Sequence, residues 1–247
     1  MPVLSGSERN IAIFLAGCIE EAYQQYQTGG TFQIPNGFRL VTTFTGTALL
    51  DPEPIGYIIE SELEAVLVFR GTATPEEWLR DLEFRQVEYE FVPSAGKTHA
   101  GFTAIYQSAR ERIFYAVRRV SAWKRLLITG HSLGGALATL AALDLAVNTP
   151  FSAPLMINFG SPRVGDPEFA DVYDNTVRNS LRVVNLFDPV PRVPFERSPT
   201  LIGKETVIYR HVEAAHLFMV HGGNLPQNHS LKVYLEGLGA NRMAKAE

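Results

Sequence analysis

The feature that most constrains this fold is an alternation of apolar, strand-like runs with helical patterns along the middle of the chain. The strand-like runs cover residues 64–70 (EAVLVFR), 125–129 (RLLIT), 155–159 (LMINF) and 181–187 (LRVVNLF). The helical patterns that follow them cover residues 75–84, 99–121, 134–147 and 167–173. Strand, helix and strand at such spacing predict an α/β fold, a mostly parallel central sheet with helices on both faces. No repeat or linker-like composition interrupts the order, so we expect residues 1–247 to form a single domain.

The two ends of the chain extend this pattern. Residues 38–44 and 54–59 predict early, antiparallel strands, and residues 230–238 predict a closing helix. Between Ile11 and Tyr26, apolar residues recur at steps of three and four, which is typical of an amphipathic helix. Residues 15–18 (LAGC) also resemble the cleavage box of a bacterial lipoprotein signal, but the apolar stripe continues past Cys18 and the preceding segment is not basic. We therefore favour the helix.

Composition excludes several classes of protein. Hydrophobic residues make up 46% and charged residues 19% of the chain, which excludes a disordered protein. The net charge of -4 and the lack of a basic cluster argue against a nucleic-acid partner. A single cysteine excludes an intrachain disulfide and a multi-cysteine metal or redox site, and no apolar run reaches the roughly 18 residues of a transmembrane segment. We therefore expect a soluble protein, cytoplasmic by default, with no transmembrane segment.

The motif most suggestive of chemistry is Gly130-His131-Ser132-Leu133-Gly134, a G-x-S-x-G nucleophile elbow. Short motifs of this kind are weak evidence by themselves. Here the strand-like run 125–129 leads directly into Gly130, and residues 134–136 (GGA) are small, as a tight turn between a strand and a helix requires. Ser132 is therefore the predicted nucleophile.

A nucleophilic serine needs a histidine base and a carboxylate that orients the histidine. In this arrangement the acid and then the histidine follow the serine along the chain. The aspartates between Ser132 and the last histidine are Asp144, Asp166, Asp171, Asp174 and Asp188. Only Asp188 directly follows a predicted strand, whereas Asp166 has the pattern of a helix N-cap and the other three lie in helical patterns. Asp188 is therefore the predicted acid.

His229 is the predicted base. His99 and His131 precede the serine, and His131 is expected to be a packing residue. His229 lies next to the polar loop 224–228, which suggests an exposed position at the end of the sheet, and His221 remains its alternative.

The remaining histidine, His211, is expected to be structural. The spacing of His211, His216 and His221 does not match the ligand spacing of a metal site on a helix, so we expect no metal.

The oxyanion of the tetrahedral intermediate requires hydrogen-bond donors that are already in place. One predicted donor is the backbone N–H of Leu133, the residue after the nucleophile. The second is expected after an earlier strand, where Thr72 follows the run 64–70 and offers its backbone N–H and its hydroxyl. An ordinary turn at Thr72 is the alternative.

Five ordered blocks together resemble the class 3 lipases, also called fungal-type lipases. The blocks are FRGT at 69–72, TGHSLGGALA at 129–138, NFGSPRVGD at 158–166, NLFDPVPRVP at 185–194 and NHSLKVYL at 228–235. The resemblance implies the α/β-hydrolase fold, no cofactor, and Ser132, Asp188, His229 and Thr72 as the matching functional residues. Unlike the secreted fungal members, this sequence has no evident signal peptide and no disulfides.

The resemblance also implies a helical lid over residues 74–85. The residues support a helix there, because Thr74 and Pro75 form a typical helix start. Trp78, Leu79 and Leu82 would form its apolar face. This face would cover the serine in water and turn onto a lipid–water interface, or would belong to a fixed helix that buries Trp78. Both interpretations of the lid segment remain open. For residues 214–220, a core strand and an acyl pocket are likewise both open interpretations.

The leading functional prediction is a triacylglycerol lipase, a serine hydrolase acting on acylglycerol esters. A phospholipase A1, a feruloyl-type esterase or a short-chain carboxylesterase would use the same residues, since fold and triad do not select the acyl group. An inactive lipid-binding module is the alternative outside enzymes.

Overall fold

The computed structural model describes residues 4–47, 51–72, 84–200 and 206–239. Its central feature is a seven-stranded sheet in the order β1-β2-β3-β6-β7-β8-β11. The strands are β1 (Arg39–Thr47), β2 (Pro52–Glu60), β3 (Glu64–Phe69), β6 (Arg125–His131), β7 (Leu155–Phe159), β8 (Ser180–Asn185) and β11 (Ala215–Phe218). The pairs β1–β2 and β2–β3 are antiparallel, and the four pairs from β3 to β11 are parallel. The predicted mostly parallel sheet with an antiparallel start is therefore confirmed.

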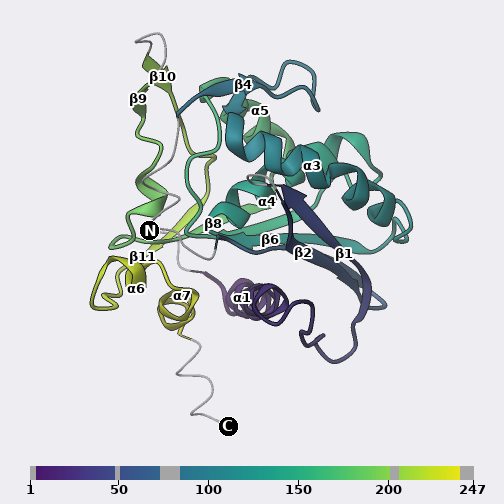
Figure 1. Ribbon diagram of the computed structural model, residues 1–247. Coiled ribbons are helices and arrows are strands. Elements are labelled where there is room, and N and C mark those ends of the chain that lie inside the picture. Colours follow the sequence, from purple (N-terminus) through teal and green to yellow (C-terminus); the bar gives the residue numbers. More distant parts are fainter. Residues whose placement is uncertain (1–3, 48–50, 73–83, 201–205, 240–247) are drawn as a thin grey trace.

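Helices cover both faces of this sheet (Figure 1). Helices α3 (Ala100–Val117), α4 (Leu133–Asn148) and α5 (Pro167–Thr176) lie on one face, and α1 (Gly6–Gln27) and α7 (Leu231–Gly237) lie on the other. Alternating side chains of each strand supply the two hydrophobic cores. In β3, for example, Leu67 and Phe69 pack with α3 and α4, whereas Val66 and Val68 pack against α1. A sheet buried on both faces explains why its strands are continuous apolar runs.

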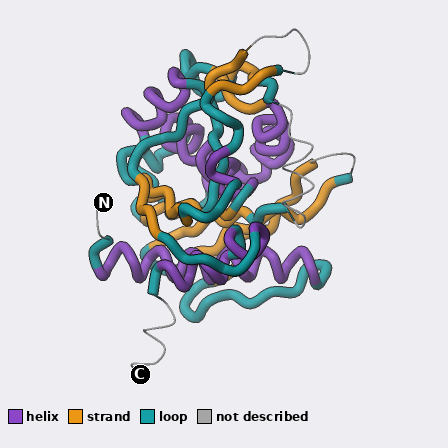
Figure 2. The backbone as a smooth tube through the Cα atoms, turned by 90° about the vertical axis from the view of Figure 1, so that its left-hand side faces the viewer, coloured by secondary structure: helices purple, strands orange, loops and turns teal. Residues whose placement is uncertain are grey.

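Helix α1 confirms the helical interpretation of the N-terminal segment. It begins after Ser5, whose side chain forms a reciprocal capping box with Glu8. The helix continues without a break past Cys18, which is buried with Leu15 and Ile19 against the sheet. Figure 2 shows α1 as the long helix that runs beneath the strands. No helix among the described residues is long and apolar enough to span a membrane.

Several short elements differ from the sequence predictions. The helix expected over 99–121 begins at Ala100 and ends at Val117, because residues Lys97–His99 form strand β5 and pair with β4 (Gln86–Glu88). The strand expected to reach residue 187 ends at Asn185. Beyond it lie the short helix η1 (Val190–Arg192), the hairpin of β9 (Arg197–Pro199) and β10 (Thr206–Ile208), and helix α6 (Leu225–Asn228).

Two further predictions have different outcomes. Residues 214–220 contain the parallel edge strand β11, so the segment is a strand, but its four residues are all half-buried and it is not a core strand; Phe218 of β11 packs edge-on against Tyr234. The predicted lid helix, with Trp78, Leu79 and Leu82, lies outside the described residues apart from its last two positions.

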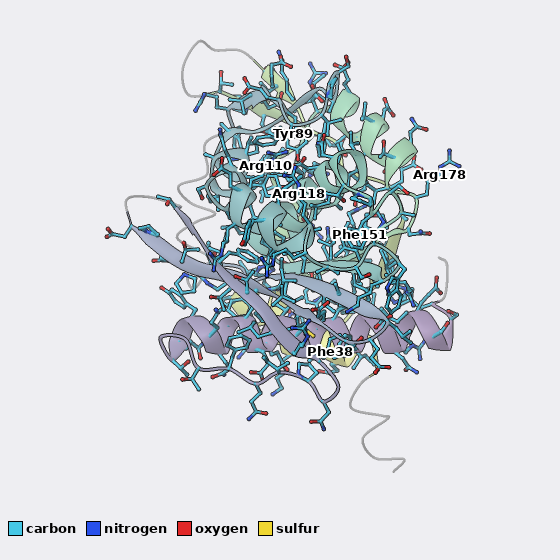
Figure 3. All side chains as sticks on the ribbon, turned by 90° about the vertical axis from the view of Figure 1, so that its right-hand side faces the viewer. Phe38, Tyr89, Arg110, Arg118, Phe151 and Arg178 are labelled. Carbon is cyan, nitrogen blue, oxygen red and sulfur yellow. The ribbon has the colours of Figure 1, made fainter. Side chains whose placement is uncertain are left out.

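One ion pair joins α3 to α4, with a buried carboxylate and a partly exposed guanidinium. The carboxylate of Asp144 is fully buried and accepts hydrogen bonds from Arg110 at 2.6 and 3.0 Å and from the Tyr106 hydroxyl at 2.8 Å. Figure 3 labels Arg110 in this layer of helices, on the opposite side of the sheet from α1. Asp144 therefore lies within a helix, as predicted, and is engaged far from the strand ends.

Candidate active site

Ser132 lies on the sharp turn between β6 and α4, as its motif predicts. Strand β6 ends at His131 and helix α4 begins at Leu133. The serine has φ 59° and ψ −128°, a strained conformation for a residue with a side chain. Its N–H donates to the carbonyl of Phe159 at 2.9 Å, and the residue is completely buried. The neighbouring strand β7 thus helps to hold the strained residue in place.

The two glycines of the motif are required by close backbone contacts. A Cβ on Gly130 would lie 2.1 Å from the carbonyl oxygen of Gly134, and a Cβ on Gly134 would lie 2.4 Å from the carbonyl oxygen of Arg70. Both distances are far below van der Waals contact and involve backbone atoms. The start of α4 therefore packs tightly against the end of β3, which brings Ser132 next to the segment that contains Thr72.

Asp188 lies just beyond the end of β8 and is held by three donors. Its Oδ1 accepts from the N–H of Val190 at 2.9 Å. Its Oδ2 accepts from Nδ1 of His229 at 2.7 Å and from the hydroxyl of Tyr234 at 2.6 Å. The carboxylate is fully buried. Burial beside this carboxylate raises the pKa of Tyr234 well above its usual value, so the hydroxyl stays protonated and keeps donating.

His229 is buried, with 3% of its surface exposed, so the exposed position expected from its polar loop is wrong. The physical reason is a pair of buried amides that fold the loop inward. Asn185 donates to the carbonyls of Asn228 at 3.1 Å and Val220 at 2.8 Å, while Oδ1 of Asn228 accepts from the N–H of Gly222 at 2.7 Å. The polar residues of this loop therefore satisfy backbone groups inside the protein.

The hydrogen bond to Asp188 fixes the tautomer of His229. An ionised carboxylate only accepts, so Nδ1 of His229 carries the proton and Nε2 is left as a base. Both Nε2 of His229 and Oγ of Ser132 are buried and have no hydrogen-bond partner within the described part of the chain. Gly160 follows β7 and lies next to Asp188 and His229. A Cβ on Gly160 would lie 3.0 Å from Oδ2 of Asp188 and 3.1 Å from Cε1 of His229.

The two predicted oxyanion donors lie on either side of Ser132. Leu133 is the first residue of α4, where a backbone N–H has no acceptor within the helix. Thr72 is half-buried beyond the end of β3, and its hydroxyl oxygen is buried without a partner among the described residues. A Cβ on Gly71 would lie 2.9 Å from Cβ of Ser132, which shows how closely the Thr72 segment approaches the serine.

The structure separates His221, His211 and His99 from this cluster. His221 is exposed and packs against Phe187, with ring centroids 5.1 Å apart. His211 is half-buried, with Nε2 donating to the carbonyl of Pro191 at 2.7 Å; desolvation, with Arg182 nearby, lowers its pKa to about 3. His99 caps the start of α3. Asp188 is thus paired with His229 and not with His221.

Sequence reasoning missed Tyr234 as part of the site. It lies on α7, 46 residues after Asp188, and only its place in the block at 228–235 connects it with His229. Among the described residues, no three His, Cys, Asp or Glu side chains form a group able to hold a metal ion.

Comparison with known proteins identifies the family. The family model for lipase (class 3) matches residues 66–198. A lipase of Rhizopus niveus is 36% identical over 65% of this chain and 42% of its own length. The chain thus spans less than half of this curated relative. The solved structure of lipase II from Rhizopus niveus has a TM-score of 0.68 and 27% identity, with 80% of each chain covered.

A further relative bears on location. The secreted mono- and diacylglycerol lipase 1 of Fusarium solani is 31% identical over 68% of this chain and 47% of its own length. The cytoplasmic location expected by default is therefore wrong, since relatives of this kind are secreted. The solved structure of the Rhizopus niveus lipase confirms the predicted α/β-hydrolase fold. The family model, which covers more than half of the sequence, confirms the resemblance to the class 3 lipases. The chain belongs to the class 3 lipase family.

Proposed function

We propose that this protein hydrolyses the carboxylic ester bonds of acylglycerols, as a triacylglycerol lipase, with Ser132 as nucleophile, His229 as base and Asp188 as the orienting acid. The observation that carries the proposal is the 2.7 Å hydrogen bond between Asp188 and Nδ1 of His229, because it leaves Nε2 as a buried base. The family membership and the strained elbow at Ser132 support the same chemistry.

In the proposed reaction, Nε2 of His229 takes the proton of Ser132 as its oxygen attacks the ester carbonyl. The N–H groups of Leu133 and Thr72 stabilise the resulting oxyanion, each contributing about 3 kcal/mol to the transition state. His229 then gives the proton to the departing glycerol oxygen, which leaves an acyl group on Ser132. A water molecule, activated by the same histidine, attacks this acyl-enzyme and releases the fatty acid.

Asp188 would stabilise the imidazolium form of His229 without taking its proton. Three donors hold the carboxylate in place, and this fixes the orientation of the histidine ring. No cofactor takes part in this scheme.

The wider arrangement is also part of the proposal. Residues 1–247 would act as a single domain. The secreted relative in Fusarium solani supports work outside the cell.

The decisive experiment measures initial rate against triacylglycerol concentration through its solubility limit. Ser132→Ala is the blank, and Ser108→Ala is a matched control, because among the described residues Ser108 hydrogen-bonds to backbone of α3 and β1, at Ile105 and Thr47. A jump in rate at the onset of emulsion supports an interfacial lipase. Smooth saturation below that limit would indicate a carboxylesterase of soluble esters, and faster release from phosphatidylcholine would indicate a phospholipase A1.

Covalent labelling separates an enzyme from an inactive module. A fluorophosphonate should label the wild type and Ser108→Ala but not Ser132→Ala. A folded wild type that resists labelling and hydrolyses no ester would refute the proposal.

A further inference from the structure

A chain of hydrogen bonds links α1 to both sides of the candidate site. The hydroxyl of Tyr23, on α1, lies 2.8 Å from Nδ1 of His131 and accepts from the N–H of Gly71 at 3.1 Å. On the other edge of the His131 ring, Nε2 lies 2.8 Å from the carbonyl oxygen of His229. His131 immediately precedes the nucleophile, Gly71 precedes Thr72, and His229 is the base. Three separate segments of the site therefore meet on two side chains.

The chemistry of the two ends fixes the direction of every bond. A carbonyl oxygen only accepts, so Nε2 of His131 must carry a proton and donate to His229. A backbone N–H only donates, so the oxygen of Tyr23 accepts from Gly71 and its own hydrogen is free to point at His131. Nδ1 of a neutral His131 accepts that hydrogen. The order Gly71 to Tyr23 to His131 to His229 therefore has a single consistent pattern of donors and acceptors.

Burial keeps His131 in the neutral form that this pattern needs. The ring is nearly inaccessible to solvent and stacks on the ring of His229, with centroids 4.5 Å apart and planes inclined by 29°. Burial and the adjacent His229 lower the pKa of His131 well below its usual value. Burial raises the pKa of Tyr23, so its hydroxyl keeps its hydrogen. Arg70 lies near Tyr23 and opposes this rise, but burial outweighs it.

We propose that Tyr23 and His131 are positioning residues, which hold the ring of His229 and the Thr72 segment in one fixed arrangement around Ser132. His131 supports His229 from two directions, by the stacked ring and by the hydrogen bond to its carbonyl. Tyr23 fixes the tautomer of His131 and the end of β3 with the same hydroxyl. The base and the oxyanion donor are thus set by one connected group of atoms.

A neutral His131 matters most when His229 is protonated. The proposed reaction places a positive charge on His229 in each half-reaction, and a charged ring 4.5 Å away would oppose it. A neutral ring of the same size fills the space without this repulsion. The inference rests on the proposed esterase function, because it assigns roles to residues around that reaction.

The test compares kcat and KM of purified variants on a soluble p-nitrophenyl ester. Tyr23→Phe keeps the ring and removes one hydroxyl, and we expect kcat to fall by about tenfold with KM within about twofold. Tyr57→Phe is the matched control, because the Tyr57 hydroxyl is also buried against α1 and donates to the carbonyl of Cys18 at 2.7 Å, with no hydrogen bond to a site residue in the described part of the chain. It should keep kcat within about twofold while losing a similar amount of thermal stability.

Variants of His131 test the hydrogen bond to His229. His131→Phe removes the donor, and His131→Gln keeps an amide N–H able to reach the carbonyl of His229. We expect His131→Gln to recover at least about tenfold of the kcat lost in His131→Phe. The double variant Tyr23→Phe/His131→Phe should lose less than the product of the two single losses, because His131→Phe already lacks the bond to Tyr23 and only the bond from Gly71 to Tyr23 remains to be lost.

The outcomes separate the inference from the function on which it rests. A wild type that hydrolyses no ester would refute the proposed function. An active wild type with a Tyr23→Phe variant of unchanged kcat would refute only the positioning role, as would losses that multiply in the double variant. If His131→Phe does not fold, Tyr23→Phe and His131→Gln measured against Tyr57→Phe still decide the matter.

Discussion

Replacing Arg110 with methionine tests whether the ion pair between α3 and α4 supports the folded state. The side chain of Arg110 makes two hydrogen bonds to Asp144, at 2.6 and 3.0 Å, while Asp144 has no exposed surface. Methionine has a similar length and apolar character, so it retains packing against Phe114, over whose ring the guanidinium lies at 4.2 Å. The variant therefore leaves a buried carboxylate without its counter-ion.

The structure sets the expected magnitude. Breaking a buried pair by removing one partner costs about 3 to 5 kcal/mol. Asp144 would keep two neutral donors, the Tyr106 hydroxyl and the side-chain amide of Asn148, each at 2.8 Å. The lower end of the range, about 3 kcal/mol, is therefore expected for the free energy of unfolding. For a chain of this size, this corresponds to a fall in Tm of about 6 to 12 °C.

Thermal unfolding followed by circular dichroism measures the effect. Arg118→Met is the control, since Arg118 lies one residue past the end of the same helix and has no carboxylate partner within the described residues (Figure 3). It should change the free energy of unfolding by less than about 0.5 kcal/mol. Adding Asp144→Asn to Arg110→Met should recover part of the loss, because an amide needs no counter-ion. An Arg110→Met protein as stable as Arg118→Met would refute the reasoning.

Three further predictions concern pH, backbone space and the carboxylate of the site. The pKa of His211 is lowered to about 3 in the folded state, against 6.5 in the unfolded chain, so the protein should become less stable as pH falls between those values, because the unfolded chain then binds the extra proton. Urea titrations at pH 7 and pH 5 should show that wild type loses about 2 kcal/mol more of its free energy of unfolding than His211→Gln does. Equal losses in the two proteins would contradict this. Gly134→Ala should reduce kcat/KM on a soluble ester at least about tenfold, since its Cβ would lie 2.4 Å from a backbone atom. Gly17→Ala, whose Cβ would have no atom within 4 Å, should raise the free energy of unfolding by about 0.5 to 1 kcal/mol. A Gly17→Ala protein that is less active or less stable than Gly134→Ala would show that the close approach at Gly134 is not limiting. Tyr234→Phe removes one of three donors to Asp188 and should lower kcat/KM about tenfold in the same assay, and full activity would show that the other two donors suffice.

Most of the sheet could be predicted from the sequence, because strands that are buried on both faces are continuous apolar runs. The run LMINF was predicted as a strand over 155–159, and β7 has these bounds. Asp166 was predicted as an N-cap with Pro167 after it, and its carboxylate indeed accepts from the N–H of Phe169. The three-residue strands β4 and β5 carry no such mark, since Lys97–His99 is too short and polar for a periodic signal.

The parts of the site that could not be predicted depend on contacts between distant segments. Tyr23 lies 108 residues from His131, and nothing in the amphipathic stripe of α1 separates it from a residue that merely packs. His131 was expected to be a packing residue, yet both of its ring nitrogens are engaged. The burial of His229 was missed because its loop is polar, and the amides of Asn185 and Asn228 are paired only once the chain has folded. The assignment of Ser132, Asp188 and His229 to catalysis stays a prediction.

The burial of Cys18 turns the only cysteine of the chain into a natural reporter of structural opening. Desolvation raises the pKa of its thiol to about 12, so in the folded protein it is protonated and out of reach of alkylating reagents. Reaction requires α1 to separate from the sheet, and Tyr23 lies on this helix five residues further along. The rate of thiol modification therefore measures how often the helix that carries Tyr23 departs from the active site, without a label or an engineered residue.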